Sequence, residues 1–193
     1  MSKLFIIAGI LLLSLVVSGT VFLYGRDPVD SQTERLAWLS ADETDVVVKN
    51  SRVFFRRQPF TGILKRNGEN GQMLSLAWYR DGFKQGPNFQ WSSDGALASI
   101  RFYLEGRPEA LNWGFWPSGS IKFLYQFKEG VLEGLSQDWY EDGTPYLRRN
   151  YSQGRELGQQ QAWNEKGKMI SNYVMKGEKR YGLVGSQPCF TVH

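Results

Sequence analysis

The sequence contains one cysteine, Cys189, and one histidine, His193, which is its last residue. A single cysteine cannot form a disulfide within the chain, so cysteine usage does not identify the redox compartment. Cys189 and His193 could supply two ligands to a metal ion, whereas zinc sites typically use three or four. We therefore expect no metal and no cofactor, and we interpret residues 183–193 as an inert or partner-facing tail.

Sequence motifs of the common enzyme classes are also missing. The chain has no G-x-S-x-G, G-x-G-x-x-G, P-loop or H-E-x-x-H pattern, and its histidine lies at a terminus that is poorly suited to catalysis. Carboxylate pairs such as Glu105 with Glu109, or Glu141 with Asp142, could flank a saccharide, but they recur with turn residues and are interpreted as solvated. We expect a protein that is not an enzyme.

Charge does not favour a nucleic-acid partner. The formal net charge is +4, and acidic and basic residues are interspersed, so no continuous basic stripe is present to follow a phosphate backbone. Aromatic residues make up 15% of the chain and glycines number 21, which together favour a turn-rich β protein over a helical or disordered one.

The amino-terminal segment is apolar and uncharged from Leu4 to Tyr24. As a helix rising about 1.5 Å per residue, this stretch would span roughly 30 Å, the thickness of a bilayer core. Lys3 precedes it, which places the amino terminus in the cytoplasm and the rest of the chain outside. Residues 1–25 are predicted to be a signal anchor of a single-pass membrane protein. The alternative is a signal peptide cleaved near Val17–Gly19, which would leave a secreted or periplasmic protein.

Within residues 26–52, the charged residues from Asp27 to Asp45 are acidic except for Arg35, and one apolar cluster lies at Leu36–Leu39. We predict an acidic, solvated spacer with one short helix at this cluster. A change of sign follows, where Arg52, Arg56 and Arg57 surround Val53, Phe54 and Phe55. This basic stretch is interpreted either as an edge strand protected by charge or as a contact with anionic lipid.

An internal repeat of 24 residues organises the rest of the chain. The repeat is marked by a series of glycines, several of which follow an asparagine or aspartate, as at Asn70, Asp94 and Asp142. This pairing predicts a tight type I′ hairpin turn at each glycine of the series. The glycines of the series are Gly71, Gly95, Gly119, Gly143 and Gly167. Four residues before the later glycines lie Trp91, Phe115, Trp139 and Trp163, which predict a stacked aromatic ladder.

The strand after each turn alternates apolar and polar residues. The sixth residue beyond each later turn glycine alternates between arginine and tyrosine, as Arg101, Tyr125, Arg149 and Tyr173. We expect these side chains to stack on one another along the array.

A second glycine series marks the connections between hairpins. Gly82, Gly106, Gly130 and Gly154 open them, and Gly62, Gly86, Gly134, Gly158 and Gly182 close them. Ala110 replaces one closing glycine, and the shifted Gly177 indicates a terminal cap. The predicted fold is all-β: an elongated, twisted antiparallel sheet of successive hairpins over residues 53–182, preceded by one amino-terminal helix.

The segments Tyr103–Gly106 and Tyr140–Gly143, each followed by a closely spaced glycine, resemble MORN repeats. They are most similar to the MORN-variant repeats of the YwqK-type antitoxin family, over roughly Phe54 to Leu183. The resemblance implies an elongated sheet of hairpins that acts as an adaptor or scaffold, sometimes at membranes. Residue by residue, it covers only the repeated glycine, tryptophan and tyrosine positions.

Aromatic residues at other positions are the candidate binding residues, since exposed aromatics carry much of the energy of recognition. Packing against neighbouring hairpins is the alternative role for each. The candidates are Trp78, Phe83, Phe89, Trp113, Trp116 and Tyr140. The expected function is an anchored adaptor that binds a partner protein. An antitoxin or immunity protein and a protein that binds or processes envelope glycans are the alternatives.

Overall fold

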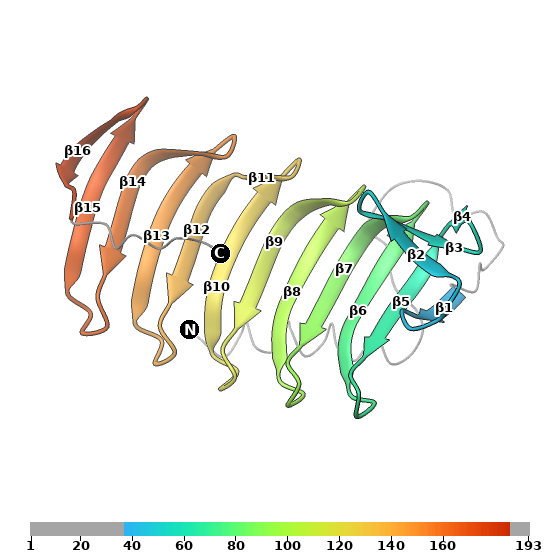
Figure 1. The fold of residues 1–193 in the computed structure, drawn as a ribbon. Coiled ribbons are helices and arrows are strands. Elements are labelled where there is room, and N and C mark those ends of the chain that lie inside the picture. Colours follow the sequence, from blue (N-terminus) through green and yellow to red (C-terminus); the bar gives the residue numbers. More distant parts are fainter. Residues whose placement is uncertain (1–36, 186–193) are drawn as a thin grey trace, which may run out of the picture. The chain divides into compact units, whose positions relative to one another are not determined.

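The computed structural model describes residues 37–185, and every regular element in this range is a β-strand (Figure 1). No helix of this part of the chain is long and apolar enough to span a membrane. The predicted anchor in residues 1–25 and the pair Cys189 and His193 lie outside the described residues. The all-β class and the succession of hairpins are confirmed.

Twelve strands form the continuous path of a thirteen-stranded sheet, in the order β1-β5-β6-β7-β8-β9-β10-β12-β13-β14-β15-β16. The short strand β11 also pairs with β10, and β2, β3 and β4 form a separate three-stranded sheet. The strands are β1 (Ala37–Ser40), β2 (Val46–Lys49), β3 (Arg52–Phe55), β4 (Gln58–Pro59), β5 (Gly62–Asn67), β6 (Met73–Arg80), β7 (Phe83–Trp91), β8 (Leu97–Leu104), β9 (Arg107–Phe115), β10 (Ile121–Lys128), β11 (Val131–Leu132), β12 (Gly134–Trp139), β13 (Pro145–Ser152), β14 (Arg155–Trp163), β15 (Met169–Lys176) and β16 (Lys179–Leu183).

The first strand corrects the expectation of a short helix at Leu36–Leu39. Ala37–Ser40 is β1, which pairs with β5 in parallel and sets Trp38 beside Ile63. Four residues make little more than one helical turn, too short to be stable alone, whereas an existing strand edge supplies hydrogen-bond partners. The long sheet is therefore mixed rather than wholly antiparallel.

The turns at the 24-residue glycines differ from the predicted type I′ geometry. At Gly95, the Gly95 N–H donates to Ser92 O (3.0 Å) and the Ser92 N–H donates to Ala96 O (2.9 Å). Gly95 has a positive φ of 87°, but Asp94 does not have a positive φ. Type I′ turns need positive φ at both central residues, so this is a three-residue loop with a type I turn followed by a left-handed glycine. The same hydrogen-bond pattern recurs at Gly71, Gly119, Gly143 and Gly167.

Two-residue turns lie at the opposite edge of the sheet, at the glycines that open the connections. Arg80 pairs directly with Phe83, and the residues between them, Asp81 and Gly82, have φ values of 50° and 80°. Positive φ at both positions is the signature of the type I′ turn. The pairs Glu105–Gly106, Glu129–Gly130 and Gln153–Gly154 repeat this conformation. The type I′ prediction was therefore wrong at the 24-residue glycines, and the type I′ turns lie instead at the glycines that open the connections.

Three of the closing glycines, Gly86, Gly134 and Gly158, lie in bulges, whereas Gly62 and Gly182 lie in regular registers. Tyr79 pairs with Lys84 and Ala77 with Asn88, so a two-residue step on β6 faces a four-residue step on β7 that includes Gly86. Gly86 has a φ of 86°, and a Cβ built on it would contact nothing within 4 Å. Glycine is therefore favoured here by backbone conformation and not by lack of space.

The small sheet is attached to the first type I′ turn. The Val53 N–H donates to Gly82 O (2.8 Å) and the Gly82 N–H donates to Phe60 O (2.7 Å). Val53 and Phe60 are 3% and 4% exposed, and the Phe60 ring centroid lies 6.2 Å from that of Tyr79. A Cβ on Gly82 would lie 2.6 Å from the Val53 carbonyl oxygen, so close backbone approach fixes this junction.

Ala110 provides a test of the bulge conformation. It occupies the position of Gly86 one repeat later and has a φ of 56°, which strains any residue with a Cβ. Ala110→Gly should raise the free energy of unfolding by about 0.5–1 kcal/mol, because relief of strain exceeds the added entropy of the unfolded chain. Urea denaturation measures the change.

Ala98→Gly is the matched control, since Ala98 lies in β8 without positive φ. This substitution should lower the free energy of unfolding by roughly 0.5–1 kcal/mol. Destabilisation by both glycines would contradict the assigned role of the bulge.

Candidate functional site

The cross-strand registers define two faces of the long sheet. One carries Trp78, Phe89, Ile100, Phe102 and Trp113 and is called the Trp face. The other carries Tyr79, Arg101, Tyr125, Arg149 and Tyr173 and is called the Arg–Tyr face. In the described part of the chain, the strands form no second layer over the Trp face.

A continuous row of directly paired residues crosses the middle of the Trp face. Its first half is apolar, and its second half consists of amides and one arginine. The row runs Leu76, Phe89, Ile100, Trp113, Leu124, Gln137, Arg148, Gln161 and Asn172. This row therefore changes from apolar to hydrogen-bonding character between β10 and β12.

Aromatic rings pack against one another in the apolar half. The Trp78 and Phe89 ring centroids lie 5.9 Å apart in an edge-on arrangement, and those of Phe102 and Trp113 lie 6.1 Å apart. All four residues are partly exposed. Three predicted binding residues, Trp78, Phe89 and Trp113, are thus brought together on one face, with Phe102 as a member that sequence reasoning missed.

The other three predicted binding residues lie at the turn edges of the sheet. The Trp116 Nε1–H donates to Trp139 O (3.1 Å), and the Tyr140 hydroxyl donates to Trp163 O (3.1 Å). Both bonds join one hairpin to the next and give these side chains a structural role. Phe83, which is 37% exposed, carries the Arg52 guanidinium 4.9 Å above its ring centroid.

The repeated tryptophans do not form the predicted stack. In the described residues, the ring pair that includes Trp91 is made with Phe89 of the same strand, at 5.9 Å. The carbonyl groups of Trp139 and Trp163 instead accept the hydrogen bonds from Trp116 and Tyr140. At Trp139 and Trp163, the repeated position therefore joins consecutive hairpins through hydrogen bonds from a side chain to the backbone.

The Arg–Tyr face carries a cluster of ionisable side chains at its C-terminal end. The Tyr125 hydroxyl donates to Asp138 Oδ1 (2.6 Å), the Tyr173 hydroxyl donates to Glu156 Oε2 (3.0 Å), and Arg149 Nη1 lies 3.7 Å from Glu156 Oε1. These bonds correct the predicted stacking of arginine on tyrosine, because both types of side chain engage carboxylates instead.

Burial perturbs the acid–base properties of this cluster. Burial raises the pKa of Asp138, although the hydrogen bond from Tyr125 and the charges of Arg149 and Lys122 act in the opposite direction. Burial, followed by the hydrogen bond to Asp138, raises the pKa of Tyr125. Tyr125 is therefore a hydrogen-bond donor and not a proton source near neutral pH.

A buried polar row lies on the Arg–Tyr face and was not predicted. Its members are Asn88, Asn112, Ser136 and Gln160, which recur every 24 residues and are between 1% and 4% exposed. Gln160 Nε2 donates to Asn150 O (2.9 Å), and Asn112 Oδ1 accepts from the Phe102 N–H (2.6 Å). The period was visible in the sequence, but polar residues suggested solvent exposure.

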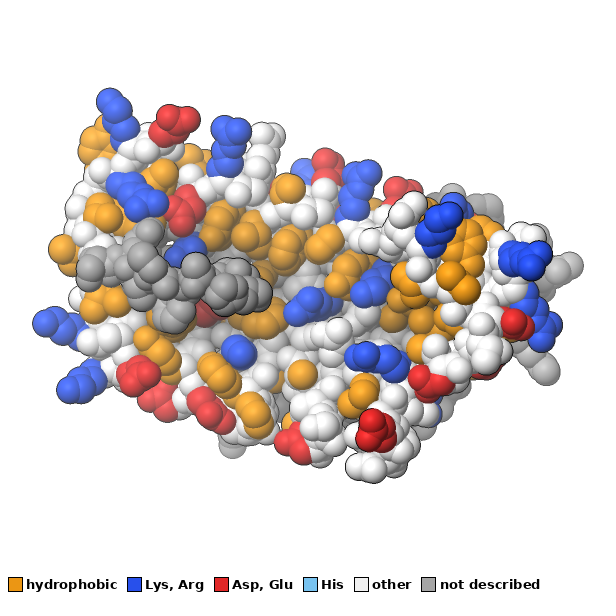
Figure 2. All heavy atoms as spheres, in the orientation of Figure 1, with side chains coloured by type: hydrophobic (Ala, Val, Ile, Leu, Met, Phe, Trp, Pro, Cys, Tyr) orange, Lys and Arg blue, Asp and Glu red, His pale blue; other side chains and the backbone are white. Residues whose placement is uncertain are grey.

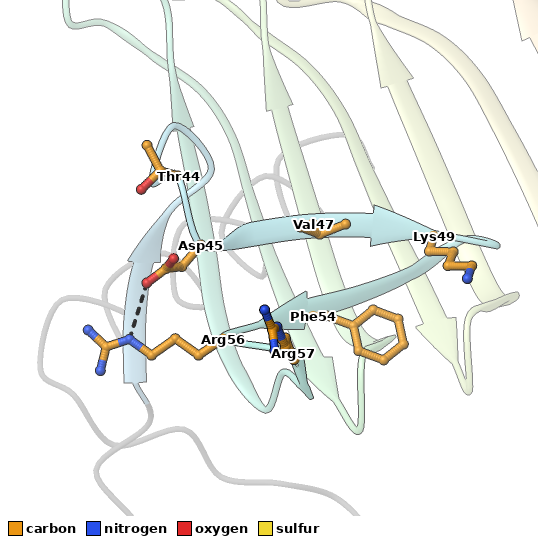
Figure 3. Close-up of a pocket in the computed structure, with 7 residues that line it drawn as sticks. All are labelled: Thr44, Asp45, Val47, Lys49, Phe54, Arg56 and Arg57. Atoms are coloured by element: carbon orange, nitrogen blue, oxygen red, sulfur yellow. Dashed lines mark hydrogen bonds and ion pairs between the residues drawn. The ribbon is translucent and has the colours of Figure 1, made fainter.

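The small sheet contributes a basic pocket of about 700 Å³. Asp45 and Arg56 form an ion pair at one end (3.3 Å), and Lys49 and Phe54 lie at the other (Figure 3). The lining residues are Thr44, Asp45, Val47, Lys49, Phe54, Arg56 and Arg57. Arg52 is committed elsewhere, because its Nε donates to Asp81 O (2.7 Å).

Comparison of the chain with models of known protein families finds no match, and no curated protein matches its sequence. Within residues 37–185, no group of three or more histidine, cysteine, aspartate or glutamate side chains could hold a metal ion. The candidate surfaces are therefore identified from the side chains that they carry.

The raised pKa of Asp138 gives a pH-dependent prediction. A carboxyl with a raised pKa in the folded state contributes stability below its unfolded pKa, near 4, and loses that contribution as pH rises through the folded value. Asp138→Asn keeps an acceptor for Tyr125 and removes the titration. The stability of the variant relative to the unsubstituted protein should therefore increase from pH 4 to pH 7.

Urea denaturation of both proteins at four pH values measures this difference. Asp94 and Asp142, whose side-chain and backbone hydrogen bonds lower their pKa values, are present in both proteins and cancel. A difference that stays flat or falls with pH would contradict the burial of a charged Asp138.

Proposed function

We propose that this chain is a non-catalytic adaptor that binds a partner protein through the apolar half of the Trp face. The observation that carries the proposal is the continuous row Leu76, Phe89, Ile100, Trp113 and Leu124, flanked by Trp78 and Phe102. Tryptophan is strongly enriched at binding hot spots, and adjacent apolar side chains exclude water around them.

The repeat itself separates binding positions from folding positions. Phe89, Trp113, Gln137 and Gln161 occupy the same place in successive repeats. All four lie on the Trp face between paired strands, so the local backbone requires neither an aromatic nor an amide there. The change from aromatic to amide at a constant position supports a surface selected for what it contacts.

The proposal places the chain at a membrane, with the repeats on the extracytoplasmic side. Its support is the uncharged run Leu4–Tyr24 and the basic residue that precedes it. Cleavage near Val17–Gly19, within this run, would give a periplasmic or secreted protein with the same binding face. Lys49 and Arg57 of the basic pocket make no ion pair within the described residues, which supports a contact with anionic lipid.

The repeat resemblance supports two further parts of the proposal. The turn glycines and the 24-residue spacing favour a MORN-like repeat, and the likeness to the YwqK-type antitoxin family makes neutralisation of a toxic partner the alternative function. Both functions use a protein-binding face, so the identity of the partner distinguishes them.

Site-specific photo-cross-linking in cells tests the binding face. With benzoylphenylalanine at Trp113 of the full-length protein, one partner should be captured, and the same group at Gln161 should capture much less. Gln161 is the matched control because it lies at the same repeat position in the amide half. Equal capture from both positions, or none from either, would contradict the proposal.

Replacement of tryptophan by glutamine supplies a second test of the binding face. Trp113→Gln gives this position the residue found one repeat later, at Gln137. It should weaken partner co-purification by about thirtyfold, since hot-spot tryptophans contribute at least about 2 kcal/mol. Trp163→Gln, at the turn edge, is the control and should change co-purification by less than about twofold. Circular dichroism of both variants checks folding.

A further inference from the structure

We propose that the Arg–Tyr face binds a linear anionic polysaccharide, independently of the protein partner on the Trp face. Phe60 contacts Tyr79, which places the small sheet on the Arg–Tyr side, and this sheet lies in front of β5–β7 in Figure 1. Figure 2, in the same orientation, therefore presents this face. Hydrophobic side chains form a band along it, with basic side chains interspersed.

Basic side chains on this face stand over tyrosine rings. Lys84 Nζ lies 4.8 Å from the Tyr103 ring centroid, and Arg180 Cζ lies 5.2 Å from that of Tyr173. Each arrangement presents a cation beside an aromatic surface. A charged sugar matches both features at Tyr103, which is partly exposed, since its carboxylate pairs with Lys84 and its C–H groups pack on the ring. Tyr173 is 7% exposed, so at that end the guanidinium of Arg180 is the group available to the sugar carboxylate.

The bases on this face are less neutralised than its acids. Lys84, Arg101 and Arg180 make no ion pair within residues 37–185. Asp138 accepts the hydrogen bond from Tyr125, and Glu156 accepts one from Tyr173 and pairs with Arg149. One of these two acids is ion-paired, against one of the four bases Lys84, Arg101, Arg149 and Arg180. The bases outnumber the acids, so the charge on the face is positive, which is complementary to a polyanion.

The geometry of the face favours a polymer over a compact ligand. Lys84 lies on β7 and Arg180 on β16, which are eight strand spacings apart along the sheet order. At about 4.8 Å per strand, the two bases are separated by roughly 38 Å. Arg101 and Arg149 lie between them on β8 and β13. A linear chain crossing the strands would contact all four in turn.

Tyrosine distinguishes a polysaccharide from an acidic peptide. Tyr79, Tyr103 and Tyr151 occupy the same position in different repeats, and Phe127 continues their series. The strand registers place these four positions on one side of the face, where the Tyr79 ring packs against Phe60. Rings at a fixed interval suit a polymer with an apolar face on each sugar, whereas an acidic peptide needs only the bases.

Binding of polygalacturonate to the full-length protein in nanodiscs of zwitterionic lipid tests the proposal. Calorimetry should show saturable binding that weakens as salt increases, and neutral dextran should not bind. The triple variant Lys84→Gln, Arg101→Gln and Arg180→Gln should bind at least about tenfold more weakly. The matched control, Lys128→Gln, Arg155→Gln and Lys166→Gln, removes the same charge from turn-edge residues and should change affinity less than about twofold.

Three outcomes would overturn the proposal. The unsubstituted protein could fail to bind polygalacturonate, or both triple variants could lose affinity equally, which would indicate a response to net charge. Polyglutamate could also bind as tightly as polygalacturonate, which would assign the face to acidic peptides. The first triple variant, in which Lys84, Arg101 and Arg180 are replaced, should still cross-link its partner at position 113. This readout separates loss of polysaccharide binding from failure of the protein-binding proposal.

Discussion

Strand register is the constraint on which the other features depend. Side chains alternate between faces, so a slip of one residue in any strand would exchange the Trp face and the Arg–Tyr face. The structure fixes register twice in each repeat, by a three-residue loop at one edge and a two-residue type I′ turn at the other. The bulge at Gly86 and its equivalents inserts an even number of residues, which preserves the alternation.

The two faces of the long sheet limit their exposure to water in different ways, and the small sheet packs on the Arg–Tyr side at Tyr79. On the Arg–Tyr face, long side chains cover a row of short polar ones, which leaves Gln160 only 1% exposed. The tyrosine hydroxyls then bond to Asp138 and Glu156, so the cover is held by directional contacts. On the Trp face, the apolar half is held by ring contacts, which leave large side chains partly exposed.

The sequence was most informative where glycine conformation determines structure. The 24-residue glycine series predicted an all-β array, because hairpin turns need a positive φ at a fixed interval and helices do not. It was less informative about which edge carries which turn. Asp94–Gly95 and Asp81–Gly82 are the same dipeptide, yet Asp94 does not have a positive φ whereas Asp81 has a φ of 50°. The number of loop residues, set by pairing across the whole hairpin, decides between them.

The same dependence on strand pairing explains why the roles of several aromatic side chains were predicted wrongly. Trp113 and Trp116 are three residues apart, and composition alone treats them alike. Register places Trp113 in the middle of a face, and the turn directs Trp116 to the next hairpin, where its N–H is satisfied. Residues that follow the repeat, such as the turn glycines, serve the fold. Positions where the repeat is kept but the residue changes in character, from Trp113 to Gln137, have no folding reason to differ.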